Sequence, residues 1–159
     1  MATSAEIGTA APDFTLAGTS TQGTRDYTLS AERGHPVVLA FYPGDDTPVC
    51  TKQLCAYQAG LGSFTDLSAT VWGISLQDIA SHEKFAAKRG LTFPLLADPT
   101  RSVHRAYDVL APLRGTKRSV FVIDADGVVA WRHVSTIGLS YKGVAEIAEV
   151  LEGLPASRP

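Results

Sequence analysis

The sequence predicts an α/β fold, with a central mixed β-sheet flanked by α-helices, and two observations carry this prediction. Residues 35–42 (HPVVLAFY) and 70–75 (TVWGIS) are apolar runs without alternation, which indicates central strands buried on both faces. Residues 118–134 hold two β-rich runs joined by Asp-Ala-Asp-Gly, which is typical of an antiparallel hairpin. Because helical sequence separates the first two runs, the sheet is expected to be parallel at first and antiparallel at its end.

The other predicted elements depend on capping residues or are short. Thr47 is a good N-cap residue and Pro48 stands at the first helical position, where a missing N–H costs nothing, so a helix is expected to begin there. Asp78 and Gly90 are the start and stop signals of a second helix. Four further elements are expected in chain order: a short strand in 25–30, another in 93–99, a short helix in 100–110 and an amphipathic helix in 141–154.

Length and composition indicate one globular domain. With 159 residues and neither repeat nor linker, residues 1–159 are expected to form a single domain, with residues 1–10 as a flexible tail. A net charge of −2 gives no basic surface of the kind that binds nucleic acid or anionic membranes. No apolar run approaches the roughly 20 residues of a membrane span, and the N-terminus lacks a signal-peptide pattern. We therefore expect a cytoplasmic protein without a nucleic-acid or membrane partner.

The stretch FYPGDDTPVCTKQLC (residues 41–55) contains both cysteines of the chain. Cys50 falls at the third position of the helix that begins after Thr47, where free backbone N–H groups and the helix dipole favour an anion. A thiol at this place is favoured as its nucleophilic thiolate. Asp45 and Asp46 oppose this effect if they face the sulfur, so a cation is required from elsewhere. The alternative is that Cys50 is a small core residue, as free cysteines often are.

Cys55 lies within the same predicted helix, five residues after Cys50. On an intact helix this spacing separates the two Cα atoms by about 8.6 Å. A disulfide requires a Cα separation of roughly 4.4 to 6.8 Å. The two sulfurs can therefore join only if residues 48–56 unwind locally. The alternative is that Cys55 is merely a buried helix residue.

Other chemistries have little support in the sequence. The four histidines (His35, His82, His104 and His133) are scattered, and the cysteine spacing does not fit a zinc site. A thioredoxin-type Cys-x-x-Cys pair is absent, as are the glycine-rich motifs that bind nucleotides and the nucleophile-elbow motif of hydrolases. With so few cysteines, a disulfide in a cytoplasmic protein would be transient and catalytic rather than structural.

The segment Pro43-x-x-x-Thr47-x-x-Cys50 resembles the active-site motif of the peroxiredoxins. The wider stretch, with a second cysteine five positions on, is similar to the bacterioferritin comigratory protein (PrxQ) subgroup. The resemblance covers nearly the whole chain, through APDFTL near the start, VVLAFYP before the motif, VWGIS and HEKF in the middle, and RSVFVIDADGVV near the end.

This resemblance implies a thioredoxin-like fold and thiol-dependent reduction of hydrogen peroxide or organic hydroperoxides. It makes Cys50 the peroxidatic nucleophile and Cys55 the resolving cysteine. Thr47 would hydrogen-bond the thiolate and the peroxide, Pro43 would shield the site from water, and Arg118 would supply the missing cation. No metal or organic cofactor is implied. The expected reductant is thioredoxin or a similar dithiol, and the expected assembly is a monomer or a weak dimer.

Two departures and two alternatives accompany this prediction. Val49 stands where the subgroup commonly has glycine, and Gly44 stands where lysine is common. These two differences are expected to affect the rate and the substrate preference rather than the type of reaction. One alternative is a one-cysteine peroxidase cycle that does not use Cys55. The other is a non-catalytic peroxide sensor or holdase that unfolds locally on oxidation.

Overall fold

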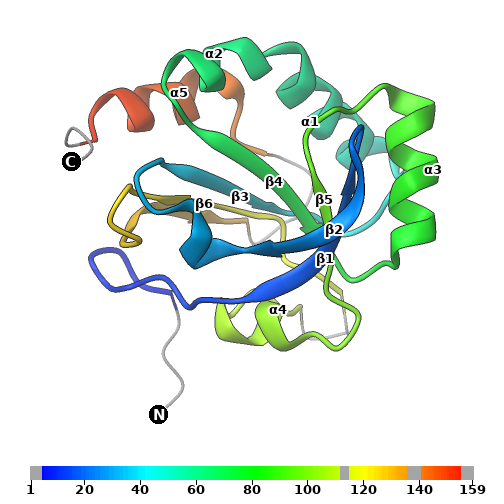
Figure 1. Ribbon diagram of the computed structural model, residues 1–159, viewed down its shortest axis with the longest axis horizontal. Coiled ribbons are helices and arrows are strands. Elements are labelled where there is room, and N and C mark those ends of the chain that lie inside the picture. Colours follow the sequence, from blue (N-terminus) through cyan, green and yellow to red (C-terminus); the bar gives the residue numbers. More distant parts are fainter. Residues whose placement is uncertain (1–4, 112–114, 136–140, 155–159) are drawn as a thin grey trace.

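A computed structural model describes residues 5–111, 115–135 and 141–154. Its frame is a seven-stranded sheet in the order β2-β1-β5-β4-β3-β6-β7. The strands are β1 (Thr15–Ser20), β2 (Gly23–Thr28), β3 (Val37–Phe41), β4 (Thr70–Ser75), β5 (Leu95–Ala97), β6 (Ser119–Ile123) and β7 (Val129–Val134). The helices are the 3₁₀-helix η1 (Leu29–Glu32), α1 (Pro48–Ala59), α2 (Leu61–Asp66), α3 (Ile79–Arg89), α4 (Ser102–Ala106) and α5 (Val144–Glu152). Figure 1 shows α1, α2 and α5 on one face of the sheet and α4 on the other.

The central strand β3 contributes to the cores on both faces of the sheet. All five of its residues are buried. Val37, Leu39 and Phe41 enter the apolar cluster on the α4 side, whereas Val38 and Ala40 enter the cluster on the side of α1 and α5. β3 pairs in parallel with β4 and antiparallel with β6. The predicted mixed sheet with a central strand buried on both faces is therefore confirmed.

The capping signals of α3 act as the sequence predicted. Asp78 is the N-cap, and its carboxylate accepts a hydrogen bond from the Ser81 N–H (2.9 Å). Gly90 ends the helix in the left-handed conformation with φ of 67°, which glycine adopts without strain. Figure 1 shows α3 next to β1 and β5 at one end of the sheet.

Two elements differ from the prediction. Strand β1, which pairs antiparallel with both β2 and β5, was not predicted, because its sequence TLAGTS consists largely of small and polar residues. The segment expected to form one helix from Thr47 divides at Gly60 into α1 and α2. Glycine is a weak helix former, and here it allows the chain to turn at that point.

Residues 5–10, which belong to the segment predicted to be a flexible tail, contact the body of the domain. Ala5 is 1% exposed, the Gly8 N–H donates to the Val129 carbonyl oxygen (2.8 Å), and Ala10 forms a β-bridge with Val128. Backbone hydrogen bonds and a small buried side chain hold this segment, and neither produces a hydrophobic pattern in the sequence. Residues 1–4 lie outside the described residues.

Candidate active site

Cys50 lies in the first turn of α1, directly after the loop that leaves β3. Thr47 occupies the N-cap position in an extended conformation, and its carbonyl oxygen accepts a hydrogen bond from the Thr51 N–H (2.8 Å). Cys50 is 0% exposed and is not in a disulfide. Burial alone is what a small apolar core residue would show. The neighbours of the sulfur must therefore distinguish a core residue from a reactive thiolate.

A buried arginine faces the sulfur. Arg118 is 4% exposed, and its Nη2 donates to Cys50 Sγ at 3.3 Å. The sheet register brings these distant residues together, because Ser119 of β6 pairs with Phe41 at the end of β3, from which the chain continues into α1. A buried guanidinium stabilises a thiolate far more than it stabilises a neutral thiol. The site therefore has the cation that the sequence analysis required.

Two further residues of α1 belong to this network, and the sequence analysis missed both. Nη1 of Arg118 donates to Gln53 Oε1 (2.5 Å), Gln53 Nε2 donates to Tyr57 Oη (3.1 Å), and the Tyr57 hydroxyl donates to the Lys142 carbonyl oxygen (2.6 Å). Burial raises the pKa of Tyr57, so its hydroxyl stays protonated and able to donate. The i, i+3, i+7 spacing of Cys50, Gln53 and Tyr57 places them on one helix face, and this spacing was the available sequence signal.

Thr47 and Pro43 lie on the loop between β3 and α1, where both are exposed. The Thr47 side chain does not cap the helix as we expected. Its Oγ1 instead donates to the Gly44 carbonyl oxygen (3.0 Å), within the loop itself. The conformation of the loop thus orients this hydroxyl. The roles of Thr47 and Pro43 towards a peroxide stay predictions.

The two loop aspartates turn towards α3. Asp45 Oδ2 lies 2.7 Å from His82 Nδ1, while Asp46 accepts from Lys88 Nζ (2.7 Å) and Arg89 Nη2 (2.9 Å). The hydrogen bonds from Lys88 and Arg89 lower the pKa of Asp46. Side chains of α3 therefore compensate the negative charge that was expected to oppose a thiolate.

Cys55 shares the continuous helix α1 with Cys50, and it too is free. It is half-buried at the margin of the apolar cluster that contains Cys50. The intact helix keeps the two Cα atoms about 8.6 Å apart, which is too far for a disulfide. Between the cysteines lies Thr51, whose Oγ1 is, within the described residues, the one buried side-chain oxygen or nitrogen without a hydrogen-bond partner.

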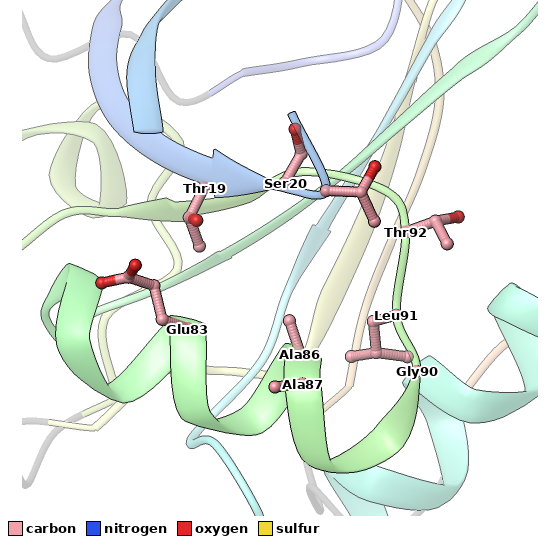
Figure 2. Close-up of a pocket in the computed structure, with 9 residues that line it drawn as sticks. Thr19, Ser20, Glu83, Ala86, Ala87, Gly90, Leu91 and Thr92 are labelled. Atoms are coloured by element: carbon pink, nitrogen blue, oxygen red, sulfur yellow. The ribbon is translucent and has the colours of Figure 1, made fainter. Parts of the chain in front are cut away.

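A cavity of about 360 Å³ lies apart from the cysteines, between the β1–β2 turn and α3 (Figure 2). Small and polar side chains make up most of its lining, and neither cysteine is among them. On the described part of the chain, no cluster of three or more histidine, cysteine or acidic residues could hold a metal ion. Within the same residues, no helix is long and apolar enough to cross a membrane.

A fully buried thiol at a helix N-terminus, bonded to a buried arginine that directly precedes β6, is an arrangement that favours a reactive thiolate on an α/β scaffold. Residues 7–132 match the model of the AhpC/TSA family. A chloroplastic peroxiredoxin Q of Oryza sativa subsp. japonica is 40% identical over 149 residues, which cover 92% of this chain and 67% of the rice protein. Peroxiredoxin Bcp of Xanthomonas campestris is 37% identical over 128 residues, covering 75% of this chain and 80% of that protein.

Among solved structures, the reduced 2-Cys peroxiredoxin of Plasmodium vivax superimposes with a TM-score of 0.84 at 26% identity, covering 92% of this chain and 94% of that one. The chain therefore belongs to the AhpC/TSA family and, within it, to the peroxiredoxins of the Q and Bcp group, which are thiol-dependent peroxidases. It has the thioredoxin-like fold that the resemblance implied. The chain spans between 56% and 67% of the length of its plant relatives.

Proposed function

We propose that Cys50 is the peroxidatic residue and Cys55 the resolving residue of a thioredoxin-linked peroxidase cycle. The Cys50 thiolate attacks one peroxide oxygen, so that an S–O bond forms while the O–O bond breaks. The departing oxygen takes up a proton and leaves as water, or as an alcohol from an organic hydroperoxide. Sulfur is oxidised by two electrons to sulfenic acid, and the peroxide is reduced by two.

The observation that carries this proposal is the contact of Arg118 Nη2 with Cys50 Sγ, 3.3 Å long and shielded from water. A fixed guanidinium at this place stabilises the thiolate, and it can also stabilise the negative charge that develops on the departing oxygen. In the proposal, the Thr47 hydroxyl and the backbone N–H groups of Val49 and Cys50 assist it, and Pro43 shields the site from water.

Resolution requires a change of conformation. The first turns of α1 unwind, Cys55 attacks the sulfenic sulfur, an S–S bond forms, and the hydroxyl group leaves as water. Thioredoxin or a similar dithiol then reduces the disulfide by thiol exchange. If unwinding is slow, a second peroxide oxidises the sulfenic acid to sulfinic acid.

The test of the whole cycle is steady-state turnover with thioredoxin, thioredoxin reductase and NADPH. A catalyst consumes NADPH continuously, in proportion to the peroxide supplied. One stoichiometric oxidation followed by arrest would contradict the proposal and favour the sensor or holdase. Size-exclusion chromatography of the same samples tests the proposed monomer or weak dimer.

Cys55→Ser separates the two-cysteine cycle from the one-cysteine cycle. We expect the variant to oxidise Cys50 at the wild-type rate, because Cys55 does not contact the sulfur while α1 is intact. The wild type should lose two hydrogens in mass on peroxide treatment, with a linked Cys50–Cys55 peptide. The variant should instead retain a sulfenic acid and lose turnover with thioredoxin. Sustained turnover by the variant would favour the one-cysteine cycle.

Thr51→Val should slow resolution. Valine keeps the shape of threonine but removes the buried hydroxyl that has no partner, so it stabilises the helical state by about 1–3 kcal/mol. Unwinding of α1 becomes rarer, and disulfide formation after oxidation should slow by about five- to 150-fold. Mass spectrometry should then show more sulfinic acid on Cys50 at high peroxide. Thr65→Val, on the exposed side of α2, is the matched control.

A further inference from the structure

Helix α3 holds a fully buried histidine against the loop that carries Thr47. We propose that His82 is a positioning residue of the peroxide reaction: through Asp45 it fixes the loop from Pro43 to Thr47 in the arrangement that Cys50 oxidation requires, without touching the reacting sulfur. This inference rests on the proposed function, because it assumes that Cys50 reacts with peroxide.

The two ring nitrogens of His82 both face acceptors. Nδ1 lies 2.7 Å from Asp45 Oδ2, and Nε2 lies 3.0 Å from the Leu96 carbonyl oxygen. A carbonyl oxygen and a carboxylate cannot donate, so both hydrogen bonds form only when both nitrogens carry a proton. His82 is 0% exposed, and the side chain of Asp45 is 4% exposed. The pair is therefore a buried imidazolium–carboxylate ion pair that joins the loop to α3 and to the middle of β5.

Asp45 is held by more than the histidine. Its carboxylate also accepts from Tyr42 Oη (2.7 Å) and Ser81 Oγ (2.7 Å), and its own N–H donates to Gln77 Oε1 (2.5 Å). Burial by itself would raise the pKa of Asp45, but the hydrogen bond and charge of His82, with the hydroxyls of Tyr42 and Ser81, hold it below the ordinary value. Removing the imidazolium would leave a buried carboxylate without its cation.

The position of Asp45 in the chain connects this ion pair to the reaction. It stands between Pro43 and Thr47, and within the same loop the Thr47 hydroxyl donates to the Gly44 carbonyl oxygen. The Thr47 carbonyl oxygen in turn accepts the first hydrogen bond of α1. A displacement of Asp45 therefore displaces both the hydroxyl and the start of the helix. The neighbouring bridges from Asp46 to Lys88 and Arg89 are solvent-exposed, and exposed bridges hold a loop only weakly.

The inference separates the two chemical steps. Oxidation of Cys50 depends on the placement of the loop from Pro43 to Thr47. Disulfide formation depends instead on unwinding of the first turns of α1, which follow this loop. Loosening the loop should therefore slow the first step, while the second step should be as fast as in the wild type or faster, because the start of α1 is loosened as well. A residue that only supported the stability of the fold would not produce this separation.

Two amide substitutions test which nitrogen of His82 matters. The amide nitrogen of asparagine occupies approximately the place of Nδ1, and that of glutamine approximately the place of Nε2. His82→Asn retains a donor to Asp45, while His82→Gln retains only a donor to Leu96. Stopped-flow mixing of reduced protein with excess peroxide resolves a peroxide-dependent oxidation phase and a peroxide-independent resolution phase.

We expect His82→Gln to lower the second-order constant of oxidation by roughly ten- to a hundredfold, as misplacement of a catalytic group does. His82→Asn should lose distinctly less, and both variants should form the disulfide as fast as the wild type or faster. Asp45→Asn removes the negative charge of the same ion pair from the loop side, and its oxidation constant should match that of His82→Gln. If His82→Gln does not fold, Asp45→Asn provides the test. Tyr107→Phe removes a partly buried hydrogen bond from the Tyr107 hydroxyl, on the other side of the sheet, to the Pro12 carbonyl oxygen, and this variant should oxidise at the wild-type rate.

Two results would overturn the inference. One is a folded His82→Gln protein, or a folded Asp45→Asn protein, that oxidises as fast as the wild type. The other is an equal slowing of both phases. If the wild type itself showed no peroxide-dependent phase, the proposed function would fail instead, so the two failures are distinguishable.

Discussion

Cys50→Ser is expected to abolish peroxide consumption. The serine hydroxyl is similar in size to the thiol but is a far weaker nucleophile near neutral pH, and it cannot store the oxidising equivalents as a sulfenic acid. Turnover with thioredoxin, thioredoxin reductase and NADPH should fall by at least on the order of a thousandfold, as it does when other enzymes lose their nucleophile. Because Cys50 is buried, the substitution also places a hydroxyl beside Arg118, which can donate to it.

Two control measurements on this variant examine its fold and the oxidation state of its remaining thiol. The circular dichroism spectrum and thermal midpoint should stay close to those of the wild type, so that loss of activity cannot be assigned to unfolding. Cys55 should remain reduced at peroxide concentrations that fully oxidise the wild type. A Cys50→Ser protein that still consumed peroxide at the wild-type rate would remove Cys50 from the reaction.

The sequence predicts those parts of the fold whose signals are local. The run TVWGIS coincides with β4, and the Asp78 and Gly90 signals enclose α3. Strand β1 gives no such signal, because its stability comes from hydrogen bonds to β2 and β5 on either side. Pairing partners of this kind are distant in the chain, and a pattern read along the sequence does not contain them.

The same division applies to the site. The residues that begin α1 are adjacent in the chain, so their sequence alone indicates Thr47 and Cys50. The contact of Cys50 with Arg118 instead depends on the register between β3 and β6. From the residues alone, Arg118 was one cation among many, and only the family resemblance singled it out. The sequence places no second histidine or cysteine close to His82, and its partner Asp45 lies 37 residues away in the chain, so no local pattern indicates its role.

The charges around the loop are arranged so that each aspartate has a cation other than the one at the sulfur. Asp45 is paired with His82, and Asp46 with Lys88 and Arg89. All three partners come from α3, which packs against β1 and β5. The Arg118 guanidinium contacts Cys50 Sγ and Gln53 Oε1.

Arg118→Met is expected to slow oxidation of Cys50 by about a hundred- to a thousandfold, the range seen when a fixed donor to a developing anion is removed. Methionine fills much of the same space but has neither charge nor N–H groups, so it leaves both Cys50 Sγ and Gln53 Oε1 without their donor. Arg118→Lys restores the charge but not the planar fork, which at this site spans two acceptors at once. Its rate should therefore lie between those of the methionine variant and the wild type. The measurement is the second-order rate constant of the peroxide-dependent phase.

Arg132→Met is the matched control, because Arg132 lies on the adjacent strand β7 and its guanidinium bonds to the Ala5 carbonyl oxygen, away from the thiol. Its oxidation rate should equal that of the wild type. Loss of the Arg118 bond also loosens Gln53 on α1, so resolution in Arg118→Met should be as fast as in the wild type or faster. A methionine variant that oxidised at the wild-type rate would mean that the buried guanidinium stabilises the fold alone, and the thiolate would then depend on the N-terminus of α1 for its stabilisation.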